Sequence, residues 1–144
     1  MIRVTQQNSA DGAKRYYAAA DYYLGDQELI GQWGGNGAAR LGLDGMVEKQ
    51  AFEQLCDNIN PQTGQPLTVR TRGERTVGYD FTFSVPKSVS LLYGLTEDKK
   101  MLDAFRGAVE ETLREVESEM KTRVRRRGQD ADRVTGNMVW AEFI

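Results

Sequence analysis

The chain has 144 residues, which is enough for one compact domain with a single core, and a single domain over residues 1–144 is predicted. Hydrophobic residues make up 40% of it and charged residues 28%, and no apolar stretch approaches the roughly 20 residues of a membrane span. We therefore expect no membrane insertion, and the absence of a secretory signal pattern at the start favours a cytoplasmic location.

The net charge, the absence of histidine and the single cysteine limit the kinds of reaction and partner that the chain can have. The formal net charge of -2 does not by itself suggest a nucleic-acid partner. The chain has no histidine, so the commonest general base and the commonest transition-metal ligand are both missing. Its single cysteine, Cys56, cannot form an internal disulfide and fits a small buried hydrophobic side chain.

The amino-terminal half is predicted to contain one strand and two helices separated by irregular segments. Residues 2–6 alternate apolar and polar side chains, as in a strand with one covered face. Residues 11–24 suit a helix, after a cap at Asn8 or Ser9. The glycine-rich residues 31–37 predict a loop with positive-φ positions, and residues 48–59 predict a short amphipathic helix.

The carboxyl-terminal half is predicted to add two strands and two helices. Residues 79–83 read as a strand that has Asp80 and the aromatic side chains on opposite faces. A helix capped by Ser84 follows, then a long helix over residues 97–127 and a strand over residues 137–144. The order of elements predicts an α+β fold, with an antiparallel sheet and helices packed on one face.

Four tyrosines lie within eight positions, at Tyr16, Tyr17, Tyr22 and Tyr23. Buried aromatic packing explains such a cluster without any chemistry, because a tyrosine ring is largely apolar. Alternatively, a tyrosine can attack a phosphodiester as a nucleophile if a base or a cation helps to remove its proton, since the phenol pKa is near 10. The helical spacing of the four residues selects no unique pair, and both interpretations remain open.

Three motifs follow one another along the chain: the tyrosine pairs of residues 16–23, the glycine-rich loop of residues 32–38 with residues 41–43, and the segment 78–90. With the segment 140–143 they span nearly the whole chain. In type and order they resemble the motifs of the conjugative relaxases of the TrwC/TraI (MobF) family. The resemblance implies the amino-terminal part of a relaxase domain. The implied function is site- and strand-specific nicking of single-stranded DNA, and strand transfer through a phosphotyrosine intermediate, in conjugative DNA transfer.

The resemblance also implies roles for particular residues. Tyr16 and Tyr22, the first tyrosine of each pair, are the favoured nucleophiles, and Tyr17 and Tyr23 are less favoured. Asp80 is expected beside the nucleophile, where it orients a metal-binding histidine or helps to accept the tyrosine proton. Without the resemblance, Asp80 also fits a structural carboxylate that accepts hydrogen bonds from the backbone.

The family's metal site is missing from this chain. In the family, the tryptophan-containing strand is followed by three histidines that bind a metal, and this chain has none. We therefore expect a divalent metal ion in the complete domain and no metal in this fragment. The 144 residues are expected to be a truncated and inactive piece of a relaxase domain.

The basic residues give candidate DNA contacts around the Asp80 segment. Arg70, Arg72, Arg75 and Lys87 are positioned to contact phosphates, although a solvated surface explains them equally well. The expected partners are single-stranded DNA at a transfer origin and other conjugation or relaxosome proteins. Two alternatives to the enzyme remain: a non-catalytic single-strand binding module, and a structural α+β domain whose tyrosines belong to the core.

Overall fold

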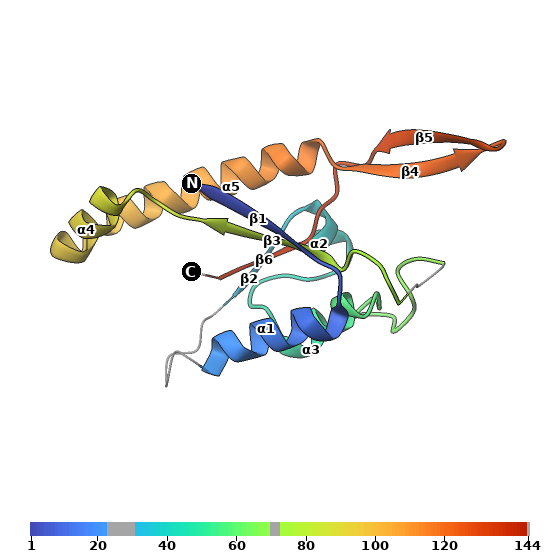
Figure 1. Cartoon of the computed structure of the whole chain (residues 1–144), viewed down its shortest axis with the longest axis horizontal. Coiled ribbons are helices and arrows are strands. Elements are labelled where there is room, and N and C mark those ends of the chain that lie inside the picture. Colours follow the sequence, from blue (N-terminus) through green and yellow to red (C-terminus); the bar gives the residue numbers. More distant parts are fainter. Residues whose placement is uncertain (23–30, 70–72, 144) are drawn as a thin grey trace. The chain divides into compact units, whose positions relative to one another are not determined.

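The computed structural model describes residues 1–22, 31–69 and 73–143 (Figure 1). The chain divides into two compact units, which are described separately below. The tyrosine unit contains Val4–Asp80 and Val139–Ile144, and the ribbon unit contains Met1–Arg3 and Phe81–Met138. The prediction of one domain over residues 1–144 stays a prediction.

The first strand, β1 (Ile2–Gln7), pairs with β3 (Gly78–Phe83), and each unit holds one end of this pair. In the tyrosine unit, the Val77 amide donates to the Gln7 carbonyl over 2.7 Å. In the ribbon unit, the Ser84 amide donates to the Met1 carbonyl over 2.9 Å. The predicted strands at residues 2–6 and 79–83 are both confirmed, but the covered face expected for residues 2–6 is not found, since all five residues are exposed.

Two helices of the tyrosine unit pack against each other. In α1 (Ala10–Tyr22), the Ser9 hydroxyl accepts a hydrogen bond from the Gly12 amide over 3.1 Å, which is the N-cap contact that the sequence predicts. Ala13 of α1 and Ala51 of α3 (Lys49–Cys56) are both buried, because small side chains let the two helices approach closely. The helix predicted over residues 48–59 ends earlier, at Cys56, and Asn58 follows with a φ of 64°.

The glycine-rich segment is wrongly predicted as a loop throughout. β2 (Gln32–Gly34) pairs antiparallel with β6 (Trp140–Glu142), and α2 (Asn36–Arg40) follows it. The strand tolerates Gly34 because the Trp140 indole occupies the space that a Cβ would need. The predicted positive φ is found at Gly35, where φ is 95°.

The ribbon unit contains the helices α4 (Lys87–Thr96) and α5 (Lys99–Ser118). The prediction that Ser84 caps α4 is wrong, since the helix starts at Lys87 with Pro86 as N-cap. α5 is capped by the Asp98 carboxylate, which accepts from the Lys100 amide over 3.0 Å. Val109 and Leu113 of α5 are buried, as the helical apolar spacing predicts.

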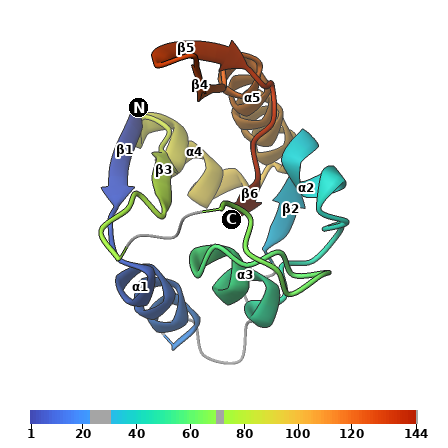
Figure 2. The ribbon, with the colours of Figure 1, turned by 90° about the vertical axis from the view of Figure 1, so that its right-hand side faces the viewer.

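A two-stranded ribbon replaces the last part of the predicted long helix. The helix predicted over residues 97–127 ends at Ser118, and β4 (Lys121–Arg126) pairs antiparallel with β5 (Gln129–Val134). The turn residues Arg127 and Gly128 have φ values of 49° and 80°, the left-handed geometry that two-residue hairpins require. Figure 2 shows the two strands beside each other after α5.

The α+β class with antiparallel strands and helices is confirmed. Within the described residues the strands form three two-stranded sheets, β1–β3, β2–β6 and β4–β5. No helix in the described part of the chain is long and apolar enough to cross a membrane.

Candidate active site

An aromatic cluster surrounds Tyr17 on α1. Its ring lies edge-on to Phe52 of α3, with 4.8 Å between ring centroids, and stacks on Phe143 at 5.9 Å. Phe143 reaches this place because it follows β6, which pairs with β2 in the same unit. The half-buried Tyr17 of α1 therefore packs against both α3 and the carboxyl-terminal end of the tyrosine unit.

The same burial changes the acidity of Tyr17. Desolvation, which is the largest cause, and the negative charge of Asp80 both contribute to raising the pKa of the Tyr17 hydroxyl to about 12. A phenol in a peptide has a pKa near 10, so the phenolate of Tyr17 is about 100-fold rarer than that of a free phenol. Burial and Asp80 therefore disfavour the ionised form of Tyr17.

Tyr16 differs from its neighbour in exposure. Its side chain is 56% exposed, and its ring stands edge-on to Tyr17 with 5.2 Å between the centroids. A core role shared by all the tyrosines does not fit an exposed Tyr16. Tyr22 is the last residue of α1, but its side chain, like the whole of Tyr23, lies outside the described residues.

Asp80 lies in β3 of the same unit and is half-buried. Its carboxylate is near enough to Tyr17 to be the second-largest cause of the raised pKa of that hydroxyl. The charge of Asp80 thus acts on Tyr17, and Tyr16 is in ring contact with Tyr17. The expected place of Asp80 beside the nucleophile stays a prediction.

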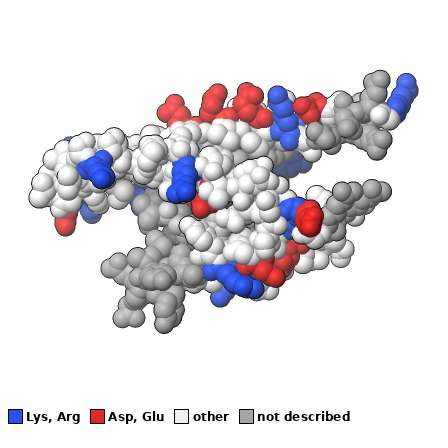
Figure 3. All heavy atoms as spheres, in the orientation of Figure 1, with Lys and Arg blue, Asp and Glu red and all other residues white. Residues whose placement is uncertain are grey.

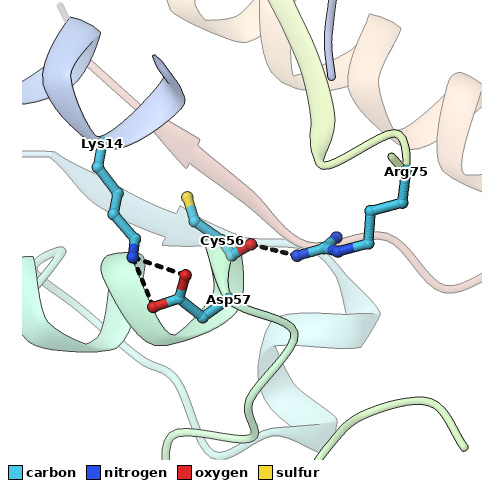
Figure 4. A network of polar contacts seen from close by, with 4 residues as sticks. All are labelled: Lys14, Cys56, Asp57 and Arg75. Atoms are coloured by element: carbon cyan, nitrogen blue, oxygen red, sulfur yellow. Dashed lines mark hydrogen bonds and ion pairs between the residues drawn. The ribbon is translucent and has the colours of Figure 1, made fainter. Parts of the chain in front are cut away.

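A polar network that the sequence analysis missed connects α1 to α3 (Figure 4). The Lys14 ammonium donates to both carboxylate oxygens of Asp57, over 2.6 and 2.5 Å, and the aspartate raises the pKa of the lysine through this hydrogen bond. The Arg75 guanidinium donates to the Cys56 carbonyl at the end of α3. Lys14 is three positions before Tyr17 and neighbours it on the surface of α1, but no spacing within α1 could identify Asp57 as its partner.

Cys56 is buried, as the sequence predicts, and burial raises the pKa of its thiol. No group of three or more cysteine, aspartate and glutamate side chains in the described part of the chain could hold a metal ion. The chain also lacks histidine. The residues of this chain therefore do not fit the three-histidine metal site that the resemblance implies.

The predicted DNA contacts lie in different places. Lys87 is exposed and is the first residue of α4, in the ribbon unit. Arg75 belongs to the tyrosine unit and is half-buried, with its guanidinium on the Cys56 carbonyl. Arg70 and Arg72 lie outside the described residues. A DNA-binding role for these four residues stays a prediction.

Known proteins are similar to this chain in sequence, and solved structures are similar to it in fold. A family model described as "TrwC relaxase" matches residues 9–144. The "Multifunctional conjugation protein TraI" of Escherichia coli strain K12 is 38% identical over 144 residues, and a second Escherichia coli protein of that name is 39% identical over 145. These alignments cover 99% of this chain and 8% of each relative, so the chain spans less than a tenth of their length.

Solved structures of the conjugative relaxase TrwC are similar over the whole chain. The metal-free complex of TrwC with OriT DNA has a TM-score of 0.81 and 32% sequence identity, and covers 99% of this chain and 49% of TrwC. A metal-bound complex and a copper-bound complex, each covering 50% of TrwC, give the same TM-score at 31% and 32% identity. The fold of this chain is therefore that of a conjugative relaxase domain, of which it spans about half.

The chain belongs to the TrwC relaxase family, because the family match covers all but its first eight residues. The resemblance that the tyrosine pairs and the segment 78–90 indicated is thereby confirmed.

Proposed function

We propose that this chain supplies the nucleophile-bearing part of a relaxase, which nicks single-stranded DNA at a transfer origin and transfers the cut strand during conjugation. The observation that carries the proposal is the contrast between the two neighbouring tyrosines within a TrwC-family fold. Tyr16 is exposed, whereas the hydroxyl of Tyr17 is held protonated by burial and by Asp80. Tyr16 is therefore the nucleophile, and Tyr17 supports it.

The proposed reaction is a transesterification. The phenol oxygen of Tyr16 attacks the phosphorus of the scissile phosphodiester, the bond from phosphorus to the leaving sugar oxygen breaks, and that oxygen takes up a proton. One DNA end becomes a tyrosine phosphodiester and the other a free hydroxyl. No water or external energy source is consumed, so a later attack by a DNA hydroxyl can reverse the step and join strands.

Asp80 is proposed as the acceptor of the phenol proton. A negative charge nearby disfavours a free phenolate, as the raised pKa of Tyr17 shows for the neighbouring hydroxyl. A carboxylate therefore assists only by taking the proton while the phosphorus is attacked. Tyr22 remains the second proposed nucleophile for strand transfer, with Tyr23 less favoured.

We propose a divalent metal ion for the complete domain, since two of the similar TrwC structures are metal-bound. When bound, such an ion supplies positive charge at the scissile phosphate. The residues that hold it are not among those of this chain, which contains no histidine. A cytoplasmic location and contacts with other conjugation proteins stay predictions.

The test uses a chimera in which residues 1–144 are joined to the part of TrwC that the structural match does not cover. The chimera is incubated with labelled single-stranded transfer-origin DNA and a divalent cation, and covalent protein–DNA adducts are counted on a denaturing gel. We expect an adduct whose tryptic peptide carries DNA on Tyr16. The variant Tyr16→Phe should lose at least about 99% of the first-turnover rate of nicking, because Tyr22 is proposed for the later strand transfer and not for the first cut.

The matched control is Tyr17→Phe, which removes the adjacent hydroxyl but keeps the ring against Phe52 and Phe143. We expect it to retain adduct formation within about three-fold. An undiminished adduct in Tyr16→Phe would refute the assignment. DNA binding by the chimera without any adduct would refute the nicking activity and leave the single-strand binding module instead.

A further inference from the structure

Phe143 has no role in the proposed reaction, although its ring lies against the tyrosine pair. It is half-buried and follows β6, which pairs antiparallel with β2 in the tyrosine unit. Its ring stacks on the Tyr17 ring, with 5.9 Å between the centroids and 27° between the ring planes. This side chain therefore contacts the helix that carries the proposed nucleophile.

Gly31 provides the space that the Phe143 ring occupies. The glycine is buried, and a Cβ at this position would overlap the Phe143 ring. The backbone of Gly31 is itself held in place, because its carbonyl accepts a hydrogen bond from the Val47 amide over 2.8 Å. The Phe143 ring is thus bounded by the Gly31 backbone as well as by Tyr17.

Tyr17 is in contact with two phenylalanine rings that come from different parts of the tyrosine unit. Phe52 of α3 stands edge-on to it, with 4.8 Å between the centroids, and Phe143 stacks on it. α3 has a further contact with α1 through the ion pair of Lys14 with Asp57. The Phe143 contact instead joins α1 to the β2–β6 pair, so its removal takes away a contact that α3 does not replace.

The same contact extends to Tyr16 through Tyr17. The two tyrosine rings stand edge-on with 5.2 Å between their centroids, and Tyr16 is exposed. We therefore expect a shift of the Tyr17 ring to change the orientation of Tyr16. A displacement of about 1 Å at a reacting group can cost about 100-fold in rate, so such a shift is large enough to matter.

We propose that Phe143 is a positioning residue for nicking: its ring, seated on Gly31, fixes the place of Tyr17 and, through Tyr17, the orientation of Tyr16 for attack. The proposal rests on the proposed function, in which Tyr16 is the nucleophile. Phe143 takes no part in the bond changes, because its side chain has no group that donates or accepts a proton.

The first measurement uses the chimera described above with the substitution Phe143→Ala. Single-turnover nicking of labelled transfer-origin DNA is followed at DNA concentrations that saturate the protein. DNA affinity is measured separately by fluorescence anisotropy, without the divalent cation. We expect the nicking rate to fall about ten-fold or more, because the nucleophile is misplaced. The affinity should stay within about three-fold, since Phe143 acts through Tyr17 and not on the DNA.

The second measurement needs no reaction and uses the 144-residue chain. Burial is the largest cause of the raised pKa of Tyr17, and the Phe143 ring covers one side of the Tyr17 ring. Phe143→Ala should therefore lower the pKa of Tyr17 from about 12 by roughly half a unit to one unit, because water then enters the cluster. The shift is followed by NMR titration of chain that carries ¹³C-labelled tyrosine rings.

The substitution Gly31→Ala tests the seat of the ring while Phe143 is kept. The added Cβ overlaps the Phe143 ring and displaces it, so the nicking rate should fall about five-fold or more. In the double variant Gly31→Ala, Phe143→Ala the overlap is gone. We expect its rate to be within about two-fold of that of Phe143→Ala, because both substitutions act through one contact.

The matched control is Phe83→Ala, which removes a half-buried ring that stacks on Phe81 in the ribbon unit. Neither substitution removes a charge, so variant and control keep the charge distribution of Figure 3, in which acidic side chains gather along α5. We expect the control to keep the nicking rate within about three-fold. Circular dichroism and thermal unfolding establish that the variants fold. If Phe143→Ala does not fold, Phe143→Leu takes its place, since leucine keeps apolar bulk without a flat ring.

An unchanged nicking rate in folded Phe143→Ala would overturn the proposal, and so would an unchanged pKa of Tyr17 or a loss confined to DNA affinity. An equal loss of rate in Phe83→Ala would overturn it too, since general loosening of the fold would then explain both. A chimera that forms no adduct with Phe143 intact refutes the proposed function, and this proposal with it. A chimera that forms the adduct equally fast with and without Phe143 refutes the positioning role alone.

Discussion

The nearness of Asp80 to the tyrosine pair can be measured directly through the acidity of Tyr17. The perturbation is Asp80→Asn, which removes the negative charge and keeps a side chain of almost the same size. The pKa of Tyr17 is about 12 in the structure, about two units above that of a free phenol. Burial and three neighbouring groups all contribute to this rise, and burial is the largest contribution.

The order of these contributions fixes the expected size of the effect. Because the share of Asp80 is smaller than that of burial, it accounts for less than half of the two-unit rise. We therefore expect Asp80→Asn to lower the pKa of Tyr17 by less than about one unit, to a value above about 11. The sign follows from charge: removal of a nearby anion makes the phenolate easier to form.

The assay is an NMR titration of chain labelled with ¹³C at the tyrosine ring carbon that bears the hydroxyl. The Tyr17 signal is assigned by its absence from Tyr17→Phe. The control is Asp44→Asn, an exposed position of the same unit that does not contribute to the pKa of Tyr17. An unchanged pKa in Asp80→Asn would show that the carboxylate is remote, and a fall to about 10 would show that burial is not the main cause.

Two further predictions concern the contacts that stabilise α1 and β2, and each is tested by the free energy of unfolding of a variant. Asp57→Asn should destabilise the fold by only about 0.5 kcal/mol in urea unfolding, because the Lys14 and Asp57 side chains are 23% and 41% exposed and water screens the pair. A loss that persists in about 1 M salt, where exposed charges are screened, would contradict this electrostatic account. Gly34→Ala should cost about 1–3 kcal/mol, because its Cβ would overlap the Trp140 indole. Unchanged stability in Gly34→Ala would show that β2 and β6 do not pair as described, whereas restoration by Trp140→Phe would support the overlap.

Helices and strands were predicted correctly where a segment shows a single hydrophobic periodicity. Residues 79–83 alternate cleanly, and they form β3 as expected. The helical apolar spacing of α5 runs to Met120, and the choice of Gly128 as the helix stop led to the wrong prediction of a helix over residues 121–127. The alternation of Thr122 and Val124 with basic residues, before Arg127 and Gly128, was a hairpin signal of equal length. Residues 121–126 form a strand because they pair with β5, and the sequence pattern of one segment does not show which other segment it pairs with.

The candidate site was predicted through its residue types but not through its contacts. The motifs identified Tyr16, Tyr17 and Asp80, and the family match supports the resemblance that they carried. Neither Phe143 nor Asp57 was recognised, because each approaches α1 from a distant part of the chain. Such contacts depend on how β6 pairs with β2 and how α3 packs on α1, which no spacing within one segment determines.

Two adjacent tyrosines can have opposite chemical roles because a helix turns about 100° between neighbouring residues. This turn directs Tyr17 into the cluster with Phe52 and Phe143, where its hydroxyl loses water and becomes harder to ionise. It leaves Tyr16 at the surface, within reach of a DNA strand but supported by the ring of Tyr17. Under the proposed function, burial of the Tyr17 hydroxyl would keep it from competing for the phosphate, and the ring contact with Tyr17 would help to orient Tyr16 for the attack.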